Sequence, residues 1–212
     1  ISVTGVQTCA LPIYAGADIV VNGLGCMEEI EATCEELRSY GGAVGYNGAN
    51  LMDPAGAVAL VEDCVAQHGR VDILVNNAGI QHVSPIEEFP LERWDAIIAL
   101  NLSAAFHAIR TAVTPMKARG SGRIVNVASV HGLIASPFKS AYVSAKHGII
   151  GLTKTVALEV ARSGITCNAI CPGYVWTPLV EKQIDDTAKA RGIDRASGIE
   201  RSEEHTSELQ SP

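Results

Sequence analysis

The sequence predicts a doubly wound α/β fold of the Rossmann type, in which helices cover a parallel sheet. The first observation is that short, wholly apolar runs alternate with helical stretches from Ala15 onward. Strands without polar alternation are typical of parallel sheets that are buried on both faces. The second observation is that residues rich in Gly, Asn, Ser or Pro follow each run, as at the carboxyl ends of strands, where such sheets bind ligands.

The expected elements alternate as strand and helix along the chain. DIVVN and the run at 43–46 provide the first two strands, and VDILVN, RIVNVA and TCNAI provide the next three. The stretches between them are long enough for helices, which return the chain so that the next strand runs parallel to the last. We expect strands at 18–22, 43–46, 71–76, 123–128 and 166–170, and helices at about 27–39, 54–68, 91–118 and 140–163.

Composition favours one soluble domain. Of the 212 residues, 47% are hydrophobic and 18% are charged, which suffices for a sizeable core. The net charge of -7, without a Lys/Arg cluster, argues against nucleic acid as a partner. The apolar runs are shorter than the roughly 20 residues that cross a membrane, so no membrane partner is expected. The 6 cysteines lack the spacing of a zinc site, so we expect no metal, reduced thiols and a cytoplasmic protein.

The segment YVSAK places Tyr142 and Lys146 four residues apart, on one face of an expected helix. A tyrosine, with an ordinary pKa of about 10, is a poor base at neutral pH. A nearby ammonium favours the phenolate and brings the group into the range of acid–base catalysis. Taken alone, such a pair more often belongs to a solvated helix face.

Ser129 and Asn101 complete a set that suits carbinol and carbonyl chemistry. Ser129 follows the run RIVNVA, and Asn101 begins the long helix. A hydroxyl that holds the substrate oxygen, a tyrosine that moves its proton, a lysine that tunes the tyrosine and an amide that holds a relay water would act together. Individually, caps at a strand end and at a helix start are the commoner roles of Ser and Asn.

These motifs, in this order and at this spacing, resemble the short-chain dehydrogenase/reductase family over about residues 15–200. The matching segments are NNAG at 76–79, NLSA at 101–104, Ser129, Tyr142-x-x-x-Lys146 and PGYVWTP at 172–178. The resemblance implies that Asn101, Ser129, Tyr142 and Lys146 form a catalytic tetrad and that the cofactor is a nicotinamide dinucleotide. The residues that it implies at the cofactor are Asn50, Leu51, Asn76, Ala78, Gly79, Tyr142, Lys146, Pro172, Gly173, Val175 and Thr177.

The end of the first expected strand favours NAD over NADP. A basic residue would be needed there to meet a 2′-phosphate. The segment Asn22-Gly23-Leu24-Gly25 has none, and two glutamates follow it. The acidic ribose ligand that is usual in the family is not at the strand end either.

Within the family, several stretches are similar to the bacterial D-3-hydroxybutyrate dehydrogenases. They are GIQHV at 79–83, SVHGL at 129–133, KSAY at 139–142, AKHG at 145–148 and TPLVEKQI at 177–184. A cation and amide donors beside the catalytic tyrosine would bind a small anion, whereas without the resemblance the same residues are ordinary loop and surface positions. The residues implied at a short hydroxy-acid substrate are Gln81, Ser129, His131, Lys139, Tyr142, Tyr174 (where these enzymes often have Trp) and Gln183.

The two ends of the chain do not match the family. Where a glycine-rich TGxxxGxG turn is expected, VTGVQTCALPI has Gly5 alone, and Pro12 would interrupt a helix. The tail RSEEHTSELQSP can be encoded by DNA whose reverse complement encodes VTGVQTCALPI. We therefore expect residues 1–14 and 201–212 to be translated sequencing adapter. They would flank a dehydrogenase domain at 15–200 that lacks its first strand, its phosphate loop and its last strand.

Three functions stay open at this point. The first is hydride transfer between NAD and D-3-hydroxybutyrate or acetoacetate. The second is the same chemistry on another small hydroxy acid or alcohol, and the third is a catalytically inactive fragment. The resemblance also implies a homotetramer for the full-length protein, assembled partly through the helices at 91–118 and 140–163.

Overall fold

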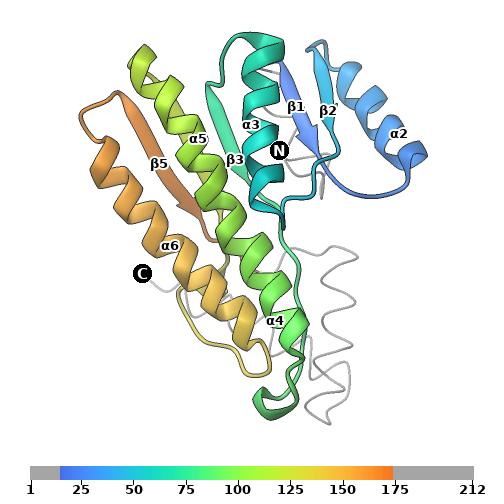
Figure 1. The fold of residues 1–212 in the computed structure, drawn as a ribbon, viewed down its shortest axis with the longest axis vertical. Helices are drawn as coiled ribbons and strands as arrows, with labels where there is room; N and C mark the ends of the chain where they lie inside the picture. Colours follow the sequence, from blue (N-terminus) through green and yellow to red (C-terminus); the bar gives the residue numbers. More distant parts are fainter. Residues whose placement is uncertain (1–14, 174–212) are drawn as a thin grey trace.

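The computed structural model describes residues 15–173, in which strands and helices alternate as predicted (Figure 1). The strands are β1 (Ile19–Asn22), β2 (Val44–Asn47), β3 (Ile73–Asn76), β4 (Gly122–Val127) and β5 (Ile165–Ile170). The helices are α2 (Met27–Arg38), α3 (Pro54–His68), α4 (Leu91–Ile98), α5 (Ala104–Arg119) and α6 (Ser140–Val160). The largest difference from the expected bounds is the end of α6, which stops at Val160 instead of 163.

The prediction that Asn101 begins the long helix is wrong. The expected single helix over 91–118 is α4 and α5 joined by a π-helical turn, η2 (Ala99–Ser103). Asn101 therefore does not begin a helix but lies in the middle of this wider turn. Nothing in the apolar periodicity marks the position, because a π turn changes the hydrogen-bonding pattern without a Gly or Pro.

All strand pairings are parallel, in two groups. β1 pairs with β2, and β3, β4 and β5 pair in that order. Among residues 15–173 no strand joins β1 to β3, so the one sheet expected from the sequence is divided. A cavity of about 340 Å³ lies at the division, lined by β1, β3 and α3 residues that include Val20, Leu60 and Leu74.

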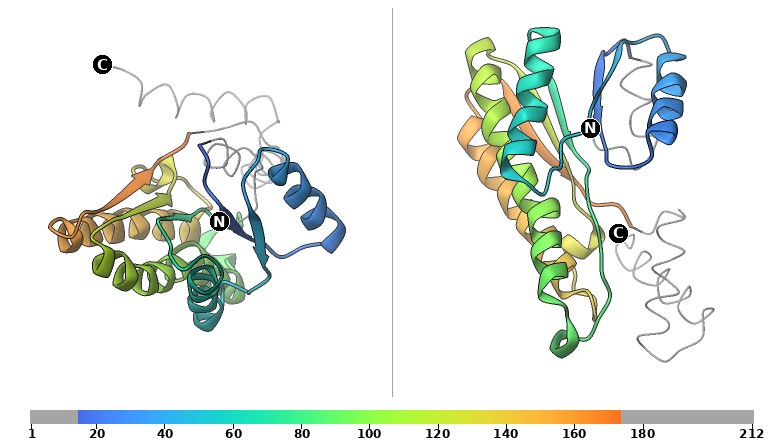
Figure 2. Two further views of the ribbon diagram at one scale, coloured as in Figure 1. Left: turned by 90° about the horizontal axis from the view of Figure 1, so that it is seen from above. Right: turned by 45° about the vertical axis from the view of Figure 1, so that its right-hand side comes forward.

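The main core lies between the three-stranded group and helices α3, α5 and α6, which run along one of its faces (Figures 1 and 2). On α5, Ala108, Ala112 and Met116 recur every four residues and are buried against the sheet. Ile124 at the centre of β4 is fully buried in the same cluster. The two alanines let α5 approach the strands closely.

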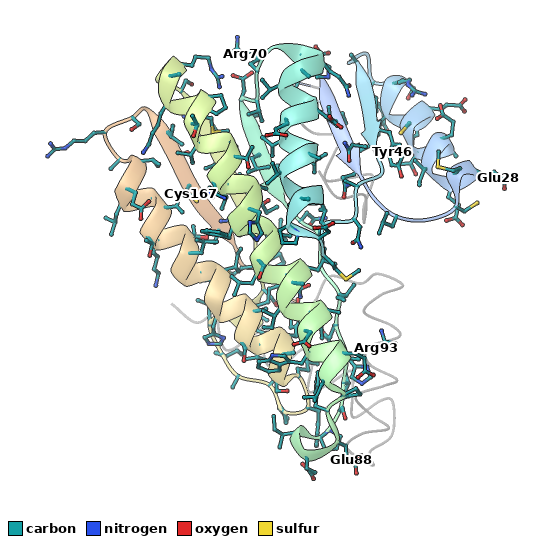
Figure 3. All side chains as sticks on the ribbon, viewed as in Figure 1. Glu28, Tyr46, Arg70, Glu88, Arg93 and Cys167 are labelled. Atoms are coloured by element: carbon teal, nitrogen blue, oxygen red, sulfur yellow. The ribbon has the colours of Figure 1, made fainter. Side chains whose placement is uncertain are left out.

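A smaller core holds α2 against β1 and β2, on the side away from α3 (Figure 2). Ile30, Cys34 and Leu37 recur at helical spacing on the buried face of α2. The opposite face is acidic, and Glu28 points away from the strands (Figure 3). The acidic residues therefore form a solvated helix face.

One described helical stretch, Leu91–Arg119, is long and apolar enough to cross a membrane by length and composition. A core helix of a water-soluble protein passes the same test. The buried residues of α5 contact α3, the strands and α6. Packing in the core therefore explains the apolar composition of this stretch.

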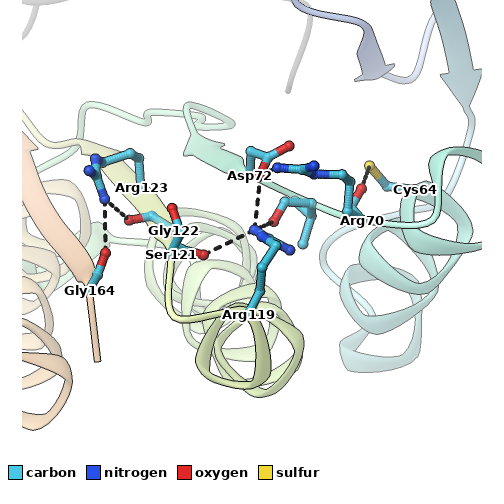
Figure 4. Close-up of polar contacts among 9 residues, drawn as sticks. Cys64, Arg70, Asp72, Arg119, Ser121, Gly122, Arg123 and Gly164 are labelled. Carbon is cyan, nitrogen blue, oxygen red and sulfur yellow. Dashed lines mark hydrogen bonds and ion pairs between the residues drawn. The ribbon is translucent and has the colours of Figure 1, made fainter. Parts of the chain in front are cut away.

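At the amino ends of β3, β4 and β5, arginine side chains join neighbouring segments (Figure 4). Asp72 forms ion pairs with Arg70 at 2.6 Å and with Arg119 at 3.1 Å. Arg123 donates a hydrogen bond of 3.0 Å to the carbonyl oxygen of Gly164, just before β5. These contacts lie at the end of the sheet opposite the predicted site, and we assign them a structural role.

Replacing Gly164 with Ala is expected to destabilise the chain by at least about 2 kcal/mol. Gly164 has a φ of 68°, and an added Cβ would overlap the carbonyl oxygen of Gly120. The matched control is Gly151→Ala in α6, where an added Cβ meets no atom within 4 Å; it should stabilise by about 0.5–1 kcal/mol. Urea unfolding followed by circular dichroism measures both, and equal midpoints for the two variants would contradict this expectation.

Candidate active site

The carboxyl ends of β3, β4 and β5 lie at one edge of the sheet, because parallel strands in register end together. Asn76 pairs with Asn126, and Val127 pairs with Ile170. The last residue of β3, the segments that follow these strands, η2 and the start of α6 hold every predicted site residue of the described chain except Asn50 and Leu51, which follow β2. The topology therefore gathers residues from distant parts of the sequence at this edge.

Asn101 fixes the segment that follows β3. Its side-chain Oδ1 accepts a hydrogen bond from the amide of Ile80, and its Nδ2 donates one to the carbonyl oxygen of Ile80, both at 2.9 Å. The side chain is 4% exposed. Because both amide groups are engaged at Ile80, the Asn101 side chain acts as a clamp on the loop that carries Gln81.

Ser129 and His131 lie directly after β4, where the 3-10 turn η3 (Val130–Gly132) begins. The Ser129 hydroxyl accepts a hydrogen bond of 3.2 Å from the amide of His131. Both side chains are buried, and the amide of Val130 donates to the carbonyl oxygen of Pro172 at 2.9 Å. The segment after β4 is thereby held against the segment after β5.

Tyr142 and Lys146 lie one turn apart on α6, as their spacing predicts. The Lys146 ammonium nitrogen is 5.6 Å from the centre of the Tyr142 ring and donates a hydrogen bond of 2.7 Å to the carbonyl oxygen of Val127. The ring of His131 meets the Tyr142 ring edge to face, with centroids 6.4 Å apart. Burial lowers the pKa of Lys146 to about 8, so at neutral pH a buried cation lies beside the phenol.

A buried polar chain, which sequence reasoning missed, connects this edge to α6. Asn76 Nδ2 donates to Asn126 Oδ1 at 2.7 Å, and Asn126 Nδ2 donates to Thr153 Oγ1 at 2.8 Å. Asn126 is fully buried, and Thr153 is on α6 two turns after Lys146. The sequence contains a signal for this chain, since Asn126 is the one polar residue within the apolar run IVNVA of an expected buried strand.

Replacing Asn126 with Leu is expected to cost about 2–4 kcal/mol of unfolding free energy. The substitution leaves Asn76 and Thr153 without the amide that both contact, and the desolvation of buried polar groups is then uncompensated. Asn168→Leu is the matched control, because Asn168 is exposed on β5; it should change stability by less than about 0.5 kcal/mol. A urea midpoint for Asn126→Leu close to that of the control would show that the chain of amides contributes little.

The predicted cofactor residues are only partly brought together. Leu51, Asn76 and Ala78 line a cavity of about 30 Å³ together with Asn101. Asn50 holds the turn before α3, where its side chain accepts a hydrogen bond of 3.1 Å from the amide of Met52. Gly79 lies beside Asn101, and Pro172 and Gly173 follow β5. The predicted residues Tyr174, Val175, Thr177 and Gln183 lie outside the described part of the chain.

The predicted carboxylate-binding residues that fall within 15–173 have buried polar atoms. Lys139, directly before α6, is 2% exposed. Gln81 Nε2 is buried without a hydrogen-bond acceptor, and His131 is 4% exposed. Unpaired buried polar groups are costly in a folded protein, so the Gln81 amide nitrogen marks a place where a polar ligand is expected. Within the same residues no group of three His, Cys, Asp or Glu side chains is arranged to bind a metal.

Comparison with known proteins gives the family. A family model described as short chain dehydrogenase matches residues 4–188. D-beta-hydroxybutyrate dehydrogenase of Rhizobium meliloti is 58% identical over 180 residues, which covers 84% of this chain and 70% of that protein. The protein of the same name from Cupriavidus necator is 54% identical over 178 residues, covering 84% and 69%. The chain belongs to the short-chain dehydrogenase family.

Solved structures agree with the fold of this short-chain dehydrogenase. Levodione reductase is 33% identical with a TM-score of 0.81, covering 86% of this chain and 72% of that one. NAD+-bound xylitol dehydrogenase is 28% identical with a TM-score of 0.82, covering 88% and 72%. The Rossmann-type α/β fold predicted from the sequence is confirmed, and the protein is an oxidoreductase.

Proposed function

We propose that the protein transfers a hydride between NAD and D-3-hydroxybutyrate or acetoacetate. The observation that carries the proposal is the burial of Lys139, a cation 2% exposed and three residues before Tyr142. A cation held inside the protein and close in sequence to the proposed acid–base residue favours a substrate that carries an anion. A short substrate with a carboxylate would provide that anion next to the reacting carbon.

Two further residues predicted at the substrate support a carboxylate rather than an uncharged substrate. His131 is buried and contacts the Tyr142 ring edge to face, and Gln81 has a buried amide nitrogen without an acceptor. Two relatives with 58% and 54% identity are D-beta-hydroxybutyrate dehydrogenases. We propose that Gln183 and Tyr174, which the sequence also implies at the substrate, complete the pocket.

A nicotinamide cofactor fits the residues at the strand ends. The Asn22 side chain is buried and donates to the carbonyl oxygens of Asn47 and Ala49 at 2.8 and 2.9 Å. No Lys or Arg follows it before Arg38, so a 2′-phosphate would lack a cation and NAD is favoured over NADP. The cofactor supplies the hydride acceptor when bound. We propose that Asn50, Leu51, Asn76, Ala78, Gly79, Pro172, Gly173, Val175 and Thr177 hold it together with Tyr142 and Lys146.

The roles of the catalytic residues follow from their surroundings. Tyr142 removes the hydroxyl proton of the alcohol, and the Lys146 ammonium stabilises the phenolate that performs this step. Ser129 Oγ donates to the substrate oxygen and so holds the carbinol carbon in place. Asn101 fixes the loop that follows β3 through its two bonds to Ile80. In the reverse direction Tyr142 returns the proton to the carbonyl oxygen.

The proposal extends to assembly and location. We propose a cytoplasmic homotetramer that uses the outer faces of α4, α5 and α6. Exposed apolar side chains support this choice, since Phe106 on α5 is 47% exposed and Leu158 on α6 is 81% exposed. Large apolar side chains on the surface commonly mark contacts between subunits.

A substrate panel with the purified chain at saturating NAD tests the proposed function. D-3-hydroxybutyrate should give a kcat/KM at least about tenfold above that of cyclohexanol, since an uncharged ring offers no anion to Lys139. Cyclohexanol is the informative competitor, because cyclohexanol dehydrogenase of an Acinetobacter strain is 40% identical. A preference for the uncharged alcohol would overturn the substrate assignment.

The same panel distinguishes the alternative of an inactive fragment. Residues 1–14 lack the glycines of a phosphate-binding turn, so we expect NAD to bind weakly, with a dissociation constant on the order of 1 mM. Substrate selectivity is the ratio of two kcat/KM values, so it can be measured at saturating NAD even if the affinity for NAD is low. Absence of turnover with every substrate would favour the inactive fragment, whereas tight, saturable NAD binding would refute the loss of the phosphate-binding turn.

A further inference from the structure

Phe138, directly before Lys139, has an unusual backbone conformation. Its φ is 65°, and it is the one described residue other than glycine with a positive φ. A bulky side chain in the left-handed region costs about 1–2 kcal/mol and persists only where its surroundings enforce it. The residue that follows is Lys139, the buried cation of the proposed substrate pocket.

The surroundings that enforce this conformation come from a distant loop. The amide of Ser84 donates a hydrogen bond of 2.9 Å to the carbonyl oxygen of Phe138. We call this bond the Ser84–Phe138 tie. Because it joins the loop after β3 to the segment before α6, it holds two chain segments that are separated by more than fifty residues.

Lys139 is thus fixed from both sides. On its amino-terminal side is Phe138, which the tie holds. On its carboxyl-terminal side, the carbonyl oxygen of Lys139 accepts the first hydrogen bond of α6, from the amide of Val143 at 2.9 Å. The direction of the Lys139 side chain follows from the backbone between these two anchors.

Gln81 is fixed in the same way on the other segment. It lies between Ile80, which Asn101 clamps with two hydrogen bonds, and Ser84, which makes the tie. The tie therefore links the segment that carries the Gln81 amide to the segment that carries the Lys139 ammonium. Both polar groups are buried.

We propose that the Ser84–Phe138 tie, with the left-handed backbone of Phe138, is a positioning device that holds Lys139 and Gln81 as one anion-binding unit. Ser84 acts through its main-chain amide and Phe138 through its backbone conformation, so neither residue needs to touch the substrate. This inference deepens the proposed function, because it rests on a carboxylate as the ligand of Lys139. The inference gives the segment at Phe138, which belongs to no catalytic motif, a role in specificity for an anionic substrate.

Amine labelling tests the tie on the 212-residue chain without substrate or cofactor. An amine-reactive reagent at pH 7, followed by mass spectrometry, reports the access of each lysine. Lys117 and Lys154 are exposed and calibrate the reagent, whereas Lys146, 5% exposed, reports whether the core is intact. Lys139 should be as protected as Lys146 in the unmodified chain.

Ser84→Pro removes the amide donor and Ser84→Ala keeps it. Loss of one hydrogen bond changes an opening equilibrium by about tenfold. Labelling of Lys139 relative to Lys146 should therefore rise about tenfold in Ser84→Pro and stay low in Ser84→Ala. A second pair of variants changes Phe138. Phe138→Val disfavours a positive φ and should expose Lys139 to the reagent. Phe138→Gly permits a positive φ and should leave Lys139 protected.

The outcomes separate positioning from general support of the fold. Labelling of Lys139 alone in Ser84→Pro and Phe138→Val supports the proposal. Labelling of Lys139 and Lys146 together in both variants means that the tie holds the fold, and the proposal fails. It also fails if Lys139 stays protected in both.

Kinetics distinguish this inference from the proposed function. With D-3-hydroxybutyrate, Ser84→Pro should raise KM more than it lowers kcat, because the anion-binding unit and not the proton-transfer group is displaced. A loss in kcat without a rise in KM would overturn the inference, even if the unmodified chain turns over D-3-hydroxybutyrate. If D-3-hydroxybutyrate is not the preferred substrate but Lys139 alone is exposed in the variants, the positioning role of the tie stands. The proposed hydroxy-acid substrate is then refuted.

Discussion

Replacing Tyr142 with Phe is expected to lower kcat with D-3-hydroxybutyrate by about a thousandfold. The phenol is the proposed group that takes the hydroxyl proton, and the ring without its oxygen has no substitute for it. The ring itself should stay in place, because its contacts with His131 and Lys146 involve the ring face and edge. Steady-state kinetics in both directions measure the loss, and KM should change by less than about threefold.

Tyr46→Phe provides the matched control for loss of a tyrosine hydroxyl. Tyr46 is on β2, in the strand pair that is separate from the three-stranded group, and its hydroxyl donates to the carbonyl oxygen of Gly23 at 2.8 Å. This control removes a phenolic hydrogen bond from a place outside the proposed chemistry. If Tyr142→Phe retains more than about a tenth of the kcat of the unmodified chain, Tyr142 is not the acid–base group.

Replacing Lys146 with Met is expected to change activity and stability in opposite directions. Activity should fall by about a hundredfold or more, because the cation that favours the Tyr142 phenolate is lost. Stability at pH 7 should rise by about 1–2 kcal/mol, because a charged group is removed from a buried position and the lost hydrogen bond to Val127 offsets only part of the gain.

The pH dependence identifies the cause of the stability change. Burial lowers the pKa of folded Lys146 to about 8, from an ordinary value of 10.5. Between these pH values the unfolded chain binds more protons than the folded chain, so the free energy of unfolding of the unmodified chain rises with pH. Lys146→Met lacks this rise, and the stability gap between the two should narrow from pH 7 to pH 10.

Urea unfolding of both chains at pH 7 and pH 10 measures the gap. Taking the difference between the two chains removes the contribution of other groups that titrate in this range. A gap that stays constant with pH would mean that Lys146 does not lose its proton at about 8. A variant less stable than the unmodified chain at pH 7 would mean that the hydrogen bond to Val127 outweighs the burial of the charge.

Much of the fold could be predicted because its determinants are local. The apolar runs IVV and ILV require no distant partner to be recognised as buried strands, and the spacing of Tyr142 and Lys146 follows from helix geometry alone. The order of strands and helices then leaves few topologies, since parallel strands need a helical crossover. The family motifs are short and continuous in sequence, so they too are readable without coordinates.

The candidate site was less predictable, because several of its properties depend on distant partners. In the π turn, the Asn101 side chain accepts a hydrogen bond from the amide of Ile80, twenty-one residues earlier in the chain. The burial of Asn126 is offset by Asn76 and Thr153, which come from another strand and from a helix. A side chain's cost of burial depends on whether such a partner exists, and the sequence around the residue does not contain that information.

The sequence by itself determined the alternation of strands and helices, the position of Tyr142 and Lys146 on one helix face and the absence of a basic residue after the first strand. Tertiary structure decided which polar residues are buried and what holds them. Lys139 reads as a solvated charge at a helix start, and only the fold places it in the interior. The physical reason is that periodicity is set by neighbours along the chain, whereas desolvation and hydrogen-bond geometry are set by neighbours in space.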